Sequence, residues 1–220
     1  MTADAMPAEP IRAYVDGSWL IKGQNNPEGT GGWGAVVFFG SERVLLSGAS
    51  KEHIVGDTHA KYDGILEVLD EIKKHPYFAK VTERQGVNAL FSDQFDPVIL
   101  YTNNNTLVEQ CARKNRSRNK RLDPAKNKSP ELRDQIAQKA ESMYVNVRAV
   151  DSKQDIASEK QRCDAEMRVA SVMARKAAQL KRLKKQGYIY LGQRLEGDAA
   201  IASIESDYQR SMAAANGAKR

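Results

Sequence analysis

The 220-residue sequence predicts an α/β fold that is followed by a helical C-terminal part. Three observations carry this prediction. Between residues 11 and 49 the chain alternates β-rich runs with turn-forming residues. From about residue 59, apolar residues recur at three- and four-residue spacing, and two short apolar runs at 97–102 and 144–150 interrupt this helical pattern. Beyond residue 156 the pattern is helical, apart from a short apolar break at 188–192.

The elements follow in order from these patterns. Strands are expected at 11–15, 33–40, 43–49, 97–102 and 144–150. Helices are expected at 59–74, 103–113, 129–143, 156–186 and 197–215. Asp16-Gly17-Ser18 is expected to end the first strand, and residues 76–96 are expected to be irregular. Residues 1–10, small and polar with two prolines, are expected to form a disordered leader.

Composition narrows the class of protein. No apolar run approaches the roughly 20 residues of a membrane span, and the N-terminal residues lack the pattern of a secretory signal. Two cysteines, Cys111 and Cys163, exclude a disulfide framework and a four-thiolate zinc site. These features favour a cytoplasmic protein without a membrane partner. The net charge of +6 and the pI near 9.2 suggest a polyanionic partner.

Five segments resemble the type 1 ribonuclease H family in the order in which that family carries them. They are AYVDGSW, NNPEGTGGWGAVV, THAKYDGILEVL, ILYTNNNTLV and, more weakly, EKQRCDAEMRVA. The resemblance implies a ribonuclease H-like domain at residues 11–178. It implies a mixed five-stranded sheet, with its first three strands antiparallel and helices on its faces. Residues 179–220 would then form a helical C-terminal extension, which could dock a protein partner.

The resemblance also places a catalytic site. The family uses four carboxylates to hold two divalent ions, one activating water and the other stabilising the leaving oxygen. The corresponding positions here are Asp16, Lys61, Asn103 and Asp164, of which only the first and last are acidic. We therefore expect metal binding by Asp16 and Asp164 to be weak or lost, and no cofactor unless the site still takes Mg²⁺ or Mn²⁺. As an alternative, the Lys61 ammonium could pair with both aspartates and replace the metal's charge.

Other family positions differ as well. Asp57-Thr58 stands where the family has a substrate-contacting Asn pair, and the segment before Asp164 contains no histidine. Changes at several positions favour a natural pseudoenzyme over a laboratory-inactivated variant. Among neighbouring acids, Asp63 should point to a different face of its helix, whereas Asp57 and Asp96 are expected in loops and stay candidates for rescuing the site.

Two basic clusters and one glycine are candidate nucleic-acid contacts. The first cluster could grip phosphates or form a solvated linker, and comprises Arg113, Lys114, Arg116, Arg118, Lys120, Arg121, Lys126 and Lys128. The second cluster lies on the long helix, where it could extend the phosphate-binding surface or merely keep a projecting helix solvated. It comprises Arg168, Arg175, Lys176, Lys181, Arg182, Lys184 and Lys185. Gly32 lets a backbone approach closely, either nucleic acid as in the family or a packed strand.

Three functional hypotheses follow. The first is a catalytically inactive ribonuclease H-like protein that binds nucleic acid, an RNA/DNA hybrid or a duplex, through its basic residues. The second is a ribonuclease H that cleaves the RNA strand of hybrids by two-metal catalysis, seen here as an inactivated variant. The third is a structural adaptor in which the fold makes protein contacts alone.

Overall fold

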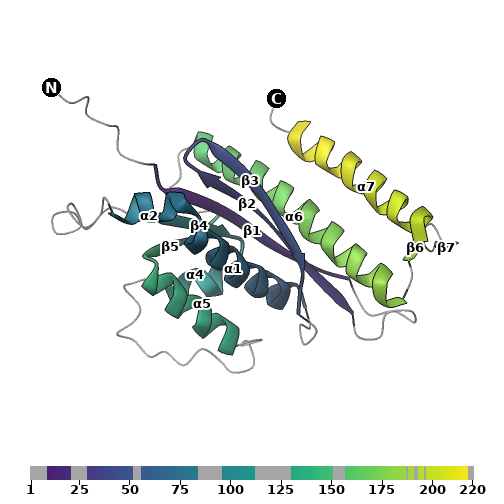
Figure 1. Ribbon diagram of the computed structural model, residues 1–220, viewed down its shortest axis with the longest axis horizontal. Coiled ribbons are helices and arrows are strands. Elements are labelled where there is room, and N and C mark those ends of the chain that lie inside the picture. The colour runs from purple at the N-terminus through teal and green to yellow at the C-terminus, as the bar shows by residue number, and fades with distance from the viewer. Residues whose placement is uncertain are drawn as a thin grey trace.

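The computed structural model shows one mixed sheet between two layers of helices, with a further helix outside them (Figure 1). The strands are β1 (Ile11–Leu20), β2 (Thr30–Phe39), β3 (Glu42–Ala49), β4 (Val98–Thr102), β5 (Val145–Ala149), β6 (Tyr188–Tyr190) and β7 (Gln193–Leu195). The helices are α1 (Asp57–Lys74), α2 (Pro76–Glu83), α4 (Asn105–Cys111), α5 (Pro130–Ser142), α6 (Ala157–Gln186) and α7 (Gly197–Gly217). The structure describes residues 9–20, 29–51, 56–83, 96–111, 130–150, 157–186, 188–190, 193–195 and 197–217.

The main sheet has the strand order β3-β2-β1-β4-β5. The first three strands pair antiparallel, and β4 and β5 pair parallel beside β1. Side chains alternate between the two faces of a strand. Accordingly Ile11, Ala13 and Val15 pack with the core that includes α1, whereas Tyr14 packs with α6. The predicted five-stranded mixed sheet, antiparallel in its first three strands, is therefore confirmed.

The α6 face is packed through small residues. A Cβ on Gly34 would lie 2.3 Å from the backbone oxygen of Ala170, and a Cβ on Gly32 would lie 2.3 Å from the backbone nitrogen of Ala178. Because both glycines lack a side chain, α6 lies directly against β2. The close approach predicted at Gly32 is made by helix α6 of the same chain, and not by a strand. Contact of Gly32 with nucleic acid gains no support from this buried position.

The structure corrects several predicted bounds. The first strand continues through Asp16-Gly17-Ser18 to Leu20, because each of these residues pairs with β2. Within the segment predicted to be irregular, Pro76–Glu83 forms α2, which begins with proline at the first helical position. Two short strands, β6 and β7, pair where an apolar break was expected. The predicted leader at 1–8 lies outside the described residues.

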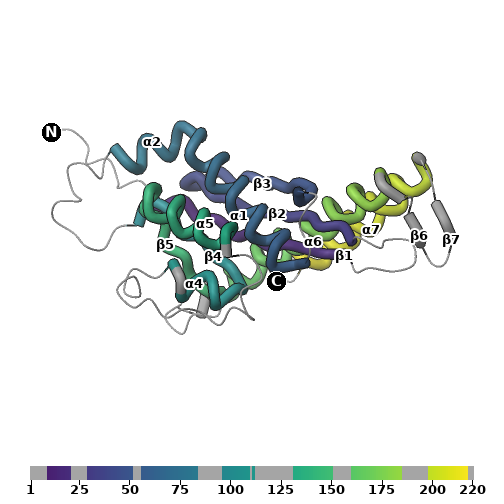
Figure 2. Tube along the Cα trace, turned by 90° about the horizontal axis from the view of Figure 1, so that it is seen from below, coloured from purple at the N-terminus to yellow at the C-terminus, as the bar shows by residue number. Residues whose placement is uncertain are grey.

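The C-terminal helix α7 packs along α6 (Figures 1 and 2). Ala200 and Ile204 are fully buried against Leu180 and Leu183 of α6. The predicted boundary between residues 178 and 179 falls inside α6, which is one continuous helix. The division into a domain and an extension stays a prediction, as does a protein partner for the extension. None of the described helices is long and apolar enough to cross a membrane.

Candidate functional site

Two of the predicted site residues meet where parallel strands β1 and β4 end. Tyr14 of β1 is opposite Tyr101 of β4, and two residues further along each chain come Asp16 and Asn103. The ends of neighbouring parallel strands lie at one edge of a sheet, so the register places these two side chains next to each other. Asp16 is buried at 8% exposure, whereas Asn103 is exposed. The site therefore has an inner and an outer acceptor oxygen.

Lys61 brings an ammonium group between these acceptors from the first turns of α1. Its Nζ lies 3.1 Å from Oδ1 of Asp16 and donates a hydrogen bond to Oδ1 of Asn103. Gly17 makes the approach of α1 possible, because a Cβ there would lie 2.3 Å from the backbone nitrogen of Lys61. The structure thus brings Asp16, Lys61 and Asn103 together, as the resemblance implies. We call these three residues the Lys61 site.

The turn after β4 is fixed by its own hydrogen bonds. Asn104 accepts a bond from the backbone N–H of Leu107 at 3.0 Å, which caps the start of α4. Its backbone N–H donates to Oγ1 of Thr102 at 3.2 Å, and its side-chain amide donates to the Tyr62 hydroxyl at 3.4 Å. Because Tyr62 follows Lys61 on α1, these bonds hold the Asn103 turn against the helix that carries the ammonium.

The Lys61 site is a poor match for divalent metal. Magnesium prefers carboxylate and other hard oxygen ligands at about 2.0–2.1 Å. Here one carboxylate and one amide oxygen already accept from a cation. Within the described part of the chain, no three His, Cys, Asp or Glu side chains are grouped so that they could hold a metal ion. The donor set therefore does not fit the two-metal arrangement that the resemblance implies.

The fourth predicted residue, Asp164, lies half-buried on α6. The preceding residue, Cys163, is buried against Tyr14, and burial, together with the neighbouring thiol, raises the pKa of the Tyr14 phenol. Asp164 is thus carried on the helix that covers the end of β1. The predicted pairing of Lys61 with Asp16 is present, whereas no ion pair joins Lys61 to Asp164 among the described side chains.

The three neighbouring acids have other surroundings. Asp63 is 1% exposed and accepts from the backbone N–H of Lys51 at 3.0 Å, so it faces away from the Lys61 site, as predicted. Asp96 accepts from the side-chain amide of Asn146. Asp57 is the exposed first residue of α1 and not a loop residue. None of the three is bonded to the Lys61 site in the described structure.

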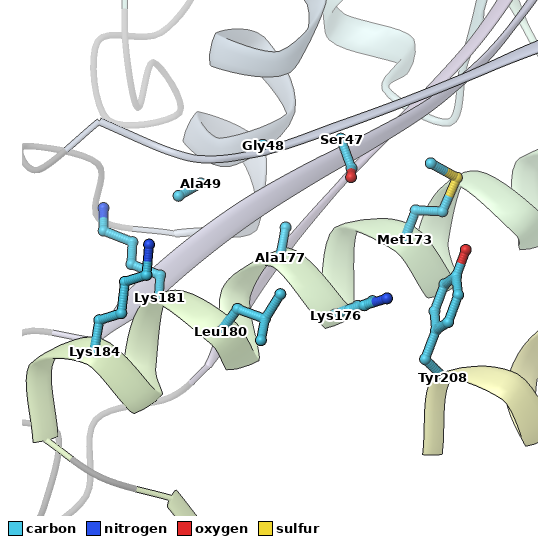
Figure 3. A pocket seen from close by; sticks show the side chains of 10 residues that line it. All are labelled: Ser47, Gly48, Ala49, Met173, Lys176, Ala177, Leu180, Lys181, Lys184 and Tyr208. Carbon is cyan, nitrogen blue, oxygen red and sulfur yellow. The ribbon is translucent and has the colours of Figure 1, made fainter. Parts of the chain in front are cut away.

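The first basic cluster, from Arg113 to Lys128, lies outside the described residues, so its role stays a prediction. The second cluster on α6 is divided by its surroundings. Figure 3 shows Lys181 and Lys184 beside Ala49, in a cavity of about 310 Å³ between β3 and α6. Lys181 donates to the backbone oxygen of Ser50. Lys176 pairs with Glu205 of α7 at 2.6 Å and lies 3.9 Å from the centre of the Tyr208 ring.

A second cavity, which the sequence analysis did not foresee, lies beside the Lys61 site. It has a volume of about 550 Å³ and opens between the end of β1, the first turn of α1, α6 and α7. Gly17 and Asp57 line one side, Arg175 the α6 side, and Arg210 and Ser211 the α7 side. We call this cavity the α6–α7 groove. Predicting this groove from the sequence would require knowing how α7 packs, and no local sequence pattern gives that information.

No protein-family model matches the sequence, and no curated protein shows significant similarity to it. Solved structures are similar in arrangement at low identity. The prototype foamy virus protease-reverse transcriptase matches over 79% of this chain, with 14% identity and a TM-score of 0.49, and the chain covers 21% of its length. LC11-RNase H1, solved in complex with an RNA/DNA hybrid, matches over 78% of this chain and 98% of its own, with 16% identity and a TM-score of 0.42.

A third structure, LC9-RNase H1, is described as a type 1 RNase H with the type 2 active-site motif. It matches over 95% of this chain and 87% of its own, with 17% identity and a TM-score of 0.46. Identities this low concern the path of the chain alone. The strand order, the antiparallel first three strands and the helices on both faces carry the conclusion. The predicted ribonuclease H-like fold is confirmed.

Proposed function

We propose that this protein is a ribonuclease H-like nucleic-acid-binding protein that does not cleave its ligand. One observation carries the proposal: the Lys61 ammonium occupies the space between Asp16 and Asn103, at the strand ends where the resemblance implies a metal-binding carboxylate cluster. The ribonuclease H-like fold supports a nucleic-acid ligand, and the Lys61 ammonium supports the loss of metal-dependent cleavage.

Electrostatics support the loss of metal binding. Two like unit charges about 4 Å apart repel by about 4 kcal/mol at an effective dielectric constant near 20, and a divalent ion would face about twice that from Lys61. Asn103 keeps an oxygen but has no negative charge, so it adds little attraction. Asp16 and Asp164 would be left as the two acidic ligands, against four in the family.

The ammonium also stabilises the site without metal. Two carboxylates at the ends of adjacent parallel strands would repel each other, whereas here one cation is shared by a carboxylate and an amide oxygen. A buried charge is tolerated when it is paired and hydrogen-bonded. Lys61 therefore holds β1, β4 and α1 in the ribonuclease H-like arrangement, which preserves a surface beside the site for binding.

Nucleic-acid binding is supported by charge. The chain carries 34 Lys+Arg against 28 Asp+Glu, and the excess includes the cluster from Arg113 to Lys128. Contacts from such residues to phosphates supply affinity without reading sequence. LC11-RNase H1, which has a similar chain path, was solved with an RNA/DNA hybrid. We therefore propose a hybrid or duplex as a ligand that binds through phosphates.

Cleavage is tested with a labelled RNA/DNA hybrid in Mg²⁺ or Mn²⁺. We expect no cleavage by the wild-type protein and restored cleavage by the Lys61→Glu/Asn103→Asp double variant. A matched control, Lys51→Glu, makes the same charge change on a lysine outside the site and should stay inactive. Cleavage by the wild-type protein would contradict the proposal.

Binding is tested by fluorescence anisotropy with the same hybrid and a DNA duplex. We expect the logarithm of the affinity to fall linearly with the logarithm of the salt concentration, as counterions are released from phosphates. Absence of binding to any nucleic acid, or binding that is independent of salt, would favour a structural adaptor.

A further inference from the structure

The α6–α7 groove starts at the Lys61 site. Gly17, which lines it, is the residue after Asp16, and Ser18 follows on the same strand. Helix α7 runs alongside α6 and forms the opposite wall with Asp207, Arg210 and Ser211 (Figure 1). Any polymer that passes the Lys61 site on this side therefore meets a groove with walls on both sides and not an open surface.

Three cations line the groove, two of them already compensated, and the Asp57 carboxylate lines it beside Gly17. Lys176 pairs with Glu205 at 2.6 Å, and Arg210 pairs with Asp207 one turn earlier on α7. Arg175 is exposed and has no ion pair with any side chain that the structure describes. Of the α6 cluster that the sequence singled out, Arg175 is thus the cation that stays available to a ligand in this groove.

Three serine hydroxyls line the same groove as this cation. Ser18 of β1, Ser171 of α6 and Ser211 of α7 all line the groove. Arginine offers five N–H donors in a planar fork that matches phosphate geometry, and serine hydroxyls commonly bond phosphate and sugar oxygens. The lining therefore fits a ligand with one phosphate near Arg175 and several polar oxygens along both walls.

We propose that the α6–α7 groove binds a single strand of nucleic acid, with a backbone phosphate at Arg175 and the strand passing Gly17 towards Lys61. The inference rests on the proposed nucleic-acid function and adds a single strand to the hybrid or duplex proposed above. A cavity of about 550 Å³ has the volume of a pocket for one ligand of moderate size. That volume suits nucleotides of one strand lying inside the groove, whereas a double helix would lie across it.

The experiment measures anisotropy of the full-length protein with a fluorescein-labelled 12-nucleotide single strand and with the hybrid of the same sequence. The test variants are Arg175→Gln and Ser171→Glu, both at exposed positions of α6. The control is Lys73→Gln, an exposed lysine in the last turn of α1. It lies at the opposite end of α1 from Asp57, which lines the groove, and it belongs to neither basic cluster.

We expect Arg175→Gln to weaken single-strand binding several-fold and to reduce the salt slope by about 0.7, the value for one phosphate contact on a single strand. Ser171→Glu should weaken the same binding by repulsion, and Lys73→Gln should change it little. The hybrid should be affected less than the single strand by both test variants.

Two results would overturn the inference while leaving the proposed function intact. In one, both test variants bind the single strand as the wild-type protein does. In the other, they weaken hybrid and single strand equally. If the wild-type protein bound neither ligand, the proposed function itself would fail, and this inference would fail with it.

Discussion

Helix α1 carries two buried charged side chains that are two residues apart and are satisfied in different ways. Lys61 reaches partners on two strands, the Asp16 carboxylate at 3.1 Å and the Asn103 amide oxygen. Among the described residues, Asp63 is bonded to Lys51, through its backbone N–H at 3.0 Å and its ammonium at 3.3 Å. Two helical residues are about 200° apart, so the two charges face different parts of the molecule.

The difference separates a site from a structural clamp. Asp63 fixes the chain just after β3, and its partner Lys51 keeps half of its side chain in water, at 53% exposure. Lys61 and Asp16 have side-chain exposures of 10% and 11%, and the residues around them come from β1, α1 and the turn after β4. The Lys61 charge thus joins three elements at the strand ends, whereas the Asp63 charge fixes one segment of the chain to the same helix.

The largest expected effect comes from reversing the charge at Lys61. Lys61→Glu would place a second carboxylate beside Asp16 with no cation between them. Removing one partner of a buried ion pair costs about 3–5 kcal/mol, because the other charge is left uncompensated. We expect a loss of this size in the free energy of unfolding, measured by urea denaturation.

The matched control is Lys51→Glu, which makes the same charge change opposite Asp63. Lys51 is half-exposed, so water and salt would screen the new repulsion, and the loss should be smaller. Equal losses in the two variants would show that the Lys61 site is no more buried in solution than the Asp63 clamp, and the distinction between them would be lost.

Metal should rescue the double variant Lys61→Glu/Asn103→Asp. It adds two carboxylates to Asp16, which gives three at the strand ends and α1, so Mg²⁺ or Mn²⁺ should bind and raise the melting temperature. Binding to the folded state alone stabilises it by about 2.7 kcal/mol at a concentration one hundred times the dissociation constant. The wild-type protein should show no shift. A double variant that is insensitive to both ions would indicate that Asp164 cannot complete the site.

The meeting of Asp16, Lys61 and Asn103 was predicted from the resemblance to ribonuclease H. Strand and helix patterns located the segments that carry these residues, and the family supplied the arrangement of the segments. The partner of Lys61 was less predictable: the pairing with Asp16 is present, whereas Asp164 lies on α6 without an ion pair to Lys61. The position of Asp164 is decided by how α6 packs, and helix packing depends on contacts between residues that are distant in the sequence.

Local chemistry misled at the end of β1. Asp-Gly-Ser is typical of a turn, yet these residues continue β1 and pair with β2. Gly17 is required there because the backbone of α1 lies 2.3 Å from where its Cβ would be. From the sequence, a glycine that is required for close packing cannot be distinguished from a glycine that is required for a turn. Distinguishing the two requires the position of the helix that packs against it. Local sequence could not predict the α6–α7 groove either, because one of its walls is α7, which is distant in the sequence from β1 and α1.

A moderate effect is expected from Asp63→Asn. The amide oxygen can still accept from the backbone N–H of Lys51, but the ion pair with its ammonium is lost. Hydrogen bonds to charged groups contribute about 1.5–3 kcal/mol, and part of this remains in the variant. We expect a loss of about 1–2 kcal/mol in urea denaturation, with nucleic-acid binding unchanged. Weakened binding would link the Asp63 clamp to the ligand surface and contradict its purely structural role.

The smallest effect concerns the pH dependence that Lys51 adds. Partial burial alone would lower the pKa of Lys51, but the hydrogen bond to Glu67 and the charge of Asp63 more than offset this and raise it. A raised pKa in the folded state stabilises the protein fully below the unfolded value of about 10.4. That stability is lost as the pH rises through the folded value. Because Lys51 is half-exposed, the contribution should stay below about 1 kcal/mol.

The measurement is the difference in unfolding free energy between the wild-type protein and Lys51→Gln, followed from pH 8 upwards. Taking the difference cancels the titration of the other lysines. We expect the wild-type protein to be slightly more stable at pH 8 and its advantage to shrink as Lys51 loses its proton. An advantage that persists or grows at high pH would contradict a contribution from the ammonium. No advantage at pH 8 would mean that the backbone N–H bond to Asp63, which both proteins keep, holds the clamp without the ammonium. In that case the ion pair of Asp63 would matter far less than that of Lys61, because the N–H bond does not depend on the Lys51 side chain.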